Sequence, residues 1–120
     1  MSGMGILETY QDNGSITKAL VKNASGRARA IVITNANVAA RFFLLHNKAT
    51  APVATDVPRM YFLVPAGTAA APGRIELNAA FFGDNGLVLG SGVGWSISTT
   101  SGTFTDAATA ADHTVTLMYS

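Results

Sequence analysis

The chain has 120 residues, and its eight lysines and arginines face seven aspartates and glutamates, for a formal net charge of +1. This length suits one domain with a sizeable core, and so small and dispersed a charge argues against a nucleic-acid partner. The chain has no cysteine, which excludes disulfides, thiolate metal sites and a cysteine nucleophile.

The chain is poor in charge and rich in apolar residues. Charged residues make up 12% of it and apolar residues 48%, whereas a soluble domain usually has about 25% charged residues. A small domain exposes much surface for its volume and normally covers that surface with charge. We therefore expect other protein to cover part of this surface, in a homo-oligomer or a larger assembly. The alternative is a monomer coated with threonine, serine and asparagine.

Residues 1–14, MSGMGILETYQDNG, predict an irregular N-terminal arm, and residues 15–120 predict one β domain. The arm has no basic stretch followed by an apolar one, so we expect no signal peptide. No apolar run in the chain reaches the ~18–20 residues that cross a bilayer. We therefore expect a soluble protein without a membrane partner.

After the arm come short β-type runs separated by turn residues, without apolar residues at helical spacing. The strands are expected at 15–22, 27–34, 41–47, 59–65, 74–82, 86–90, 94–100 and 113–119. Asp84, Asn85 and Gly86 best fit a two-residue type I′ hairpin between 74–82 and 86–90, because both central positions of that turn need positive φ. About eight such strands predict an all-β protein, an antiparallel β-sandwich or jelly-roll-like fold, with a small barrel as the alternative.

Several expected strands, among them AIVIT, FFLL and YFLV, are apolar without alternation. This pattern indicates that both strand faces are covered. In a two-layer sandwich only one face meets the core, so the second face predicts a subunit contact. Over residues 41–47, Phe42, Leu44 and His46 share one face, opposite the face that begins with Arg41. The candidate residues for a subunit or capsid contact are Ile6, Leu7, Tyr10, Arg41, Phe43 and Leu45.

Few residues could carry catalysis. The two histidines, His46 and His113, fall at expected strand ends, and a metal site would need three or four converging ligands. The stretch GLVLGSGVGW does not form a nucleophile elbow, because Leu89 and Val93 stand where that motif has glycines. We expect no catalytic centre, metal or cofactor, although a Ser-His-Asp triad assembled from distant positions stays open.

Several short sequence landmarks follow one another in a characteristic order along residues 23–120. They are Gly26, Thr34-Asn35, Asn47-Lys48, Pro65-Ala-Gly67, Gly94-Trp95, Thr99-Thr100 and Tyr119. In this order and spacing the chain resembles a widespread type of small bacteriophage virion protein. It departs from the usual pattern in a longer small-residue stretch, GTAAAPGRIELNAAFFGDNG, over residues 67–86.

The resemblance implies a non-enzymatic structural role in a virion assembled in the bacterial host cytoplasm. Within that type it favours a capsid decoration (cement) protein that binds the major capsid protein and forms a homo-oligomer, commonly a trimer. Two alternatives stay open, a neck, tail or fibre protein and a carbohydrate- or receptor-binding β-sandwich module. The second would use exposed aromatic side chains, whereas we expect Trp95, Tyr61 and Tyr119 to pack in the core.

Overall fold

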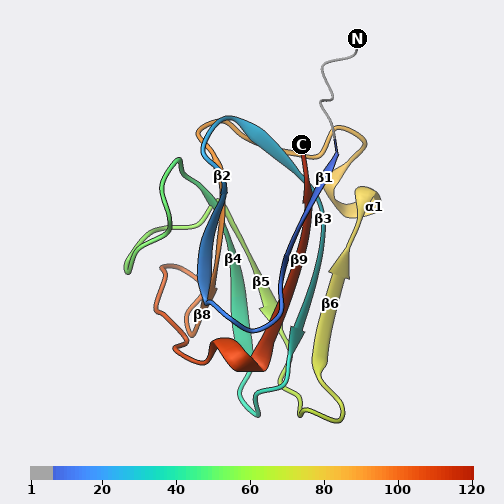
Figure 1. Ribbon diagram of the computed structural model, residues 1–120, viewed down its shortest axis with the longest axis vertical. Coiled ribbons are helices and arrows are strands. Elements are labelled where there is room, and N and C mark those ends of the chain that lie inside the picture. Colours follow the sequence, from blue (N-terminus) through green and yellow to red (C-terminus); the bar gives the residue numbers. More distant parts are fainter. Residues whose placement is uncertain (1–6) are drawn as a thin grey trace.

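A computed structural model describes residues 7–120, which form two antiparallel β-sheets packed face to face (Figure 1). The first sheet has the order β1 (Glu8–Asp12), β9 (His113–Tyr119), β3 (Gly26–Asn35) and β6 (Gly73–Leu77), and β7 (Leu87–Leu89) also pairs with β3. The second sheet has the order β2 (Lys18–Lys22), β8 (Val93–Ser98), β4 (Arg41–Asn47) and β5 (Met60–Val64). The predicted all-β antiparallel sandwich is therefore confirmed. No helix within residues 7–120 is long and apolar enough to span a membrane.

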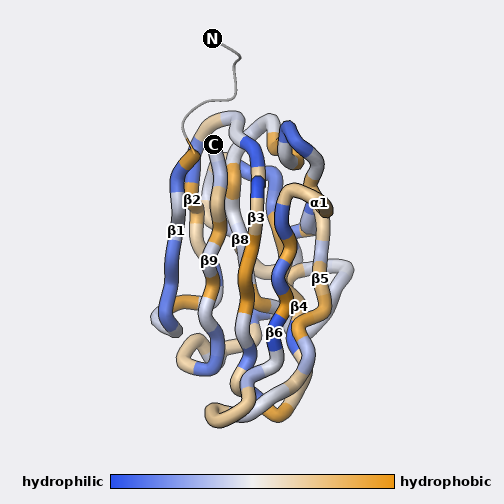
Figure 2. The backbone as a smooth tube through the Cα atoms, turned by 90° about the vertical axis from the view of Figure 1, so that its right-hand side faces the viewer, coloured by the Kyte–Doolittle hydropathy of each residue, from blue (hydrophilic) through white to orange (hydrophobic). Residues whose placement is uncertain are grey.

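The core lies between the two sheets and draws on both. Figure 2 shows a hydrophobic stretch along the middle of β3, which supplies residues to this core. The rings of Phe43 and Trp95 lie nearly parallel with centroids 6.0 Å apart. The other fully buried apolar side chains at the centre include Ile31, Ile33, Leu45, Val64, Leu89, Val93, Ile97, Val115 and Leu117.

The prediction of an irregular arm over residues 1–14 was wrong for residues 8–12, which form β1. This strand pairs with β9 along its whole length, and its Tyr10 ring packs against the Trp95 ring with the ring centroids 6.0 Å apart. Asp12 ends the strand and is 7% exposed. Its buried carboxylate accepts hydrogen bonds from the backbone N–H groups of Gly14 and Ser15 in the following turn. A partner strand distant in sequence thus fixes this short polar segment.

The hairpin predicted between residues 74–82 and 86–90 was also wrong. β6 and β7 do not pair with each other but lie end to end along the same edge of β3. Between them the chain leaves the edge in a short helix, α1 (Ala79–Phe82). The following turn is closed by the Gly86 N–H, which donates to the Gly83 carbonyl. Within this turn only the two glycines have positive φ, so it is not type I′.

Helix α1 is stabilised by a cap on its first turn and by the packing of its two aromatic side chains. The Asn78 side chain caps its first turn by accepting from the Ala80 N–H. Phe82 packs against the core cluster, and both Phe81 and Phe82 meet the Phe62 ring of β5 edge to face. The helix therefore covers the gap between the β5 and β6 edges. One further helical turn, a 3₁₀ segment at Ala110–Asp112, leads into β9.

Candidate functional site

The predicted contact face of β4 is the core face. Phe43 and Leu45 have no exposed surface, because they pair with Ile97 and Trp95 of β8 and point between the sheets with them. Their assignment to a subunit or capsid contact was therefore wrong. Arg41, at the end of the same face, is half-buried. Alternation over 41–47 identified the two faces of the strand but not which of them meets the core.

The chain's own loops cover much of the opposite face of β4. Phe104 is 2% exposed and meets the His46 ring edge to face, with centroids 6.2 Å apart. Two backbone hydrogen bonds join the loop after β4 to the loop after β8, from Thr55 to Phe104 and from Phe104 to Asp56. Leu44 and His46 are buried beneath these loops. This part of the second apolar face therefore needs no neighbour.

His46 forms a serine–histidine pair that a catalytic interpretation must consider. Its Nε2 lies 2.8 Å from the Ser96 Oγ, which is the contact between base and nucleophile in a triad. Asp56, whose charge acts on the pKa of His46, forms an ion pair with Lys48. Ser96 has no exposed surface and His46 has 1%, so a substrate cannot reach either side chain in this structure. The pair joins β4 to β8 beneath the loops.

His113 also lies buried, at the start of β9. One ring nitrogen, Nδ1, lies 3.0 Å from the Thr109 carbonyl oxygen, and burial lowers the pKa of the ring. Its neighbour Asp112 accepts a hydrogen bond from the Asn37 side chain. Within residues 7–120 no three histidine or acidic side chains gather as a metal site would require.

Acid is expected to destabilise the protein through His46. Burial lowers the pKa of His46 from 6.5 to about 4, so between these values the unfolded chain takes up a proton that the folded chain refuses. The stabilisation is complete above pH 6.5 and is lost as the pH falls toward 4. The loss should reach about 3 kcal/mol, since one pKa unit corresponds to about 1.4 kcal/mol.

Urea unfolding at a series of pH values measures this loss. His46→Gln, which cannot take up a proton, should lose less stability than the wild type over the same range. His113 contributes in the same direction, because its pKa is also lowered, so some pH dependence will stay in the variant. An unchanged pH dependence in His46→Gln would contradict the assignment to His46.

The exposed apolar surface lies instead on the outer side of β5. Tyr61 and Leu63 point away from the core and are 56% and 55% exposed. Phe42 of β4 lies opposite Leu63 in the pairing, and its ring meets the Tyr61 ring edge to face at 6.1 Å. We call Phe42, Tyr61 and Leu63 the β5 face. The expectation that Tyr61 packs in the core was therefore wrong.

A shallow hollow of about 370 Å³ adjoins the β5 face. Val57, which is 74% exposed, stands at this hollow. The hollow lies between the loop before β5 and the loop after β8, and it extends the exposed apolar surface beyond the strand. Its lining residues are Val57, Pro58, Arg59, Met60, Tyr61, Ser101 and Gly102.

β5 is an edge strand, paired with β4 on one side and with no strand of residues 7–120 on the other. Pro58 and Pro65 stand near its two ends, where they interrupt a ladder because proline has no N–H. Edge strands commonly carry charge, which discourages pairing with other chains. Met60–Val64 carries none. An uncharged edge with an exposed apolar face is typical of a surface that other protein covers.

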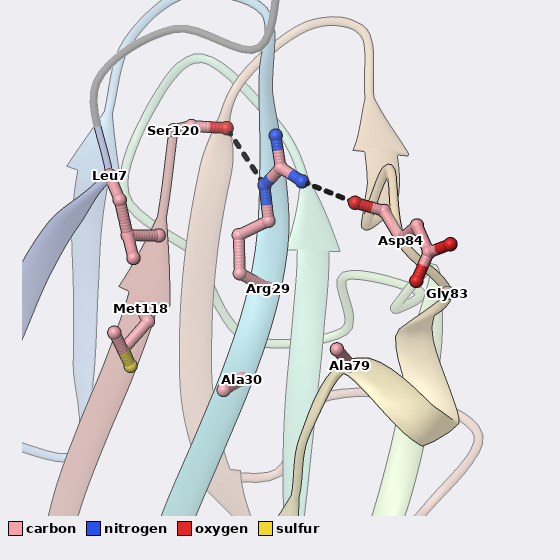
Figure 3. Close-up of a pocket in the computed structure, with 8 residues that line it drawn as sticks. All are labelled: Leu7, Arg29, Ala30, Ala79, Gly83, Asp84, Met118 and Ser120. Atoms are coloured by element: carbon pink, nitrogen blue, oxygen red, sulfur yellow. Dashed lines mark hydrogen bonds between the residues drawn. The ribbon is translucent and has the colours of Figure 1, made fainter.

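Leu7 and Tyr10, two of the contact residues predicted in the arm, lie at the far edge of the sandwich from β5. Leu7 is 53% exposed and lines, with Ala30, Ala79 and Met118, a cavity of about 310 Å³ on the outer side of the first sheet (Figure 3). Tyr10 is half-buried against Trp95. Ile6 lies outside the described residues.

The sequence prediction missed Tyr61 and Leu63, although it contained their signal. The run YFLV lacks alternation, as an apolar strand covered on both faces would, and it stands between two prolines that suit an edge.

Comparison of the chain with protein-family models, curated proteins and solved structures finds no match.

Proposed function

We propose that the chain is a non-enzymatic structural protein of a bacteriophage virion, a capsid decoration protein that binds the outer shell and stabilises contacts between capsomers. The observation that carries this proposal is the β5 face, an uncharged sheet edge with Tyr61 and Leu63 more than half exposed. Such a surface suits a protein surrounded by neighbours, and the low charge of the chain points the same way.

The partners in this proposal are the major capsid protein and further copies of the chain, with a trimer as the proposed oligomer. Each contact need only be modest, because a closed or repeated assembly multiplies it by the copy number. The proposed location is the virion, after assembly in the cytoplasm of the bacterial host. A neck, tail or fibre protein would use the β5 face in the same way, against a different neighbour.

A carbohydrate-binding module finds less support. Sugar-binding platforms need exposed aromatic faces, and Trp95 has no exposed surface. Tyr10 and Tyr119 are half-buried, which leaves Tyr61 as the one tyrosine that is mostly exposed among residues 7–120. One exposed ring beside Leu63 fits a protein contact better than a glycan platform.

Co-sedimentation with phage particles tests the proposal. Purified protein is mixed with particles that lack it, and pelleted protein is measured as its concentration rises. We expect saturable binding with a fixed number of copies per particle, and particles that withstand heat better when loaded. Binding that never saturates, or the absence of binding to any shell, would contradict the proposed function. Particles that carry only necks, tails or fibres distinguish the alternative sites.

A further inference from the structure

The described chain contains two asparagine–glycine pairs, and both lie in exposed turns. Asn13 precedes Gly14, and Asn85 precedes Gly86. Both asparagines are exposed, and both glycines have positive φ, +87° and +73°. In such a pair the glycine nitrogen can attack the asparagine side chain, because glycine has no Cβ to obstruct the approach. The two pairs share this covalent chemistry but differ in the charges around them.

Two arginines hold the turn that contains Asn85. Nη1 of Arg27 donates to the Asn85 carbonyl at 3.0 Å, and Nη1 of Arg29 donates to the Asp84 carbonyl at 2.9 Å. The second of these bonds is visible in Figure 3, where the guanidinium spans from Ser120 to the turn. A positive charge therefore lies directly on the peptide group that joins Asn85 to Gly86.

A carboxylate holds the other turn. Oδ2 of Asp12 accepts from the Gly14 N–H at 3.3 Å and from the Ser15 N–H at 3.2 Å. The nitrogen that would attack Asn13 is therefore bonded to a negative charge, whereas the Gly86 N–H donates to a neutral carbonyl, that of Gly83, at 3.1 Å. In both turns this hydrogen bond must open before attack.

The attacking nitrogen must lose its proton, and its negative charge then spreads onto the adjoining carbonyl oxygen. A guanidinium on that oxygen stabilises the anion, and a carboxylate on the N–H opposes it. We propose that Asn85 is a site of spontaneous deamidation, and that Asn13 is protected by Asp12. This proposal does not depend on the proposed function.

The reaction balances with water as its only co-reactant. The Gly86 nitrogen forms a bond to Cγ of Asn85, the Cγ–Nδ2 bond breaks, and ammonia leaves with the proton from Gly86. Water then opens the five-membered imide at either carbonyl. One product is aspartate, and the other is isoaspartate, in which the backbone runs through the side-chain carbon.

The product changes both charge and backbone at one point of the fold. The formal net charge falls from +1 to zero, since one neutral amide becomes a carboxylate. The new carboxylate lies on the residue whose backbone carbonyl Arg27 contacts, and an isoaspartate lengthens the connection between α1 and β7. That connection supplies Gly83 and Asp84 to the wall of the cavity in Figure 3, so ageing of the protein would alter this surface.

Ageing of the full chain in mildly alkaline buffer tests the proposal. Mass spectrometry of peptides measures deamidation at each asparagine, and enzymatic methylation of isoaspartate identifies the product. Asn85 should react at least about five-fold faster than Asn13, the factor that corresponds to roughly 1 kcal/mol of charge interaction. Equal rates, or faster reaction at Asn13, would overturn the proposal.

Substitutions at Arg27 separate charge from chain mobility. Arg27→Gln should slow deamidation at Asn85 and leave Asn13 unchanged, while Arg27→Lys should keep most of the wild-type rate. Thermal unfolding of each variant checks that the fold is intact. If Arg27→Gln loosens the turn, the ratio of the deamidation rates at Asn85 and Asn13 in the wild type still tests the proposal. An unaltered Asn85 rate in a folded Arg27→Gln variant would contradict the role of the guanidinium.

Discussion

Phe43→Ala is expected to lower the free energy of unfolding by about 3–5 kcal/mol, the usual cost of removing a buried phenylalanine side chain. Phe43 has no exposed surface, and its ring stacks on Trp95 at the centre of the sandwich. Removing the ring leaves a cavity between the sheets that the two rigid layers cannot close. Urea unfolding followed by tryptophan fluorescence measures the change, because Trp95 is the only tryptophan.

The matched control is the neighbouring phenylalanine. Phe42 is half-buried on the outer side of the same strand, against Tyr61, so Phe42→Ala should cost less than half as much. Comparison of the two variants also shows which face of β4 meets the core. A larger loss from Phe42→Ala than from Phe43→Ala would contradict the described packing.

Leu63→Glu is expected to abolish most binding to phage particles without unfolding the protein. Leu63 is 55% exposed at the centre of the β5 face, so a glutamate stays hydrated in the free protein. In the proposed contact the same carboxylate would be buried against apolar surface without a partner. Loss of a central contact residue commonly costs about 2 kcal/mol or more, which corresponds to roughly 30-fold weaker binding.

Ile16→Glu is the control for charge alone. Ile16 is 40% exposed and follows β1, at the opposite edge of the sandwich from β5. This variant adds the same charge and should bind particles like the wild type. Co-sedimentation measures both variants, and circular dichroism checks that both are folded. Full binding by Leu63→Glu would exclude the β5 face as the contact, and equal loss in both variants would indicate general repulsion.

The sequence predicted the sandwich because strand periodicity and turn residues are local signals. The last strand shows this well: His113, Val115 and Leu117 are buried and the residues between them are not. The position of β1 was not predictable in the same way, because its stability comes from pairing with β9 at the other end of the chain. A polar five-residue run contains little information about such a partner.

The predictions of the hairpin and of the contact face on β4 were wrong for a related reason. Asp84, Asn85 and Gly86 suit a tight turn, but the packing of Phe82 against the core and the pairing of β6 and β7 with β3 decide where the flanking segments lie. Over β4, both faces are apolar, so alternation could not rank Phe43 against Phe42. The ranking depends on which loops fold back over the strand, and Phe104 lies some sixty residues away in sequence.

Cryo-electron microscopy of purified virions tests the central claim most directly. We predict regularly arranged copies of this sandwich on the outer surface of the shell, with Tyr61 and Leu63 covered by the major capsid protein or by a neighbouring copy. Density at the neck, tail or fibres would keep a structural role but contradict decoration of the capsid. Virions without the protein, or with a β5 face open to solvent, would contradict the account.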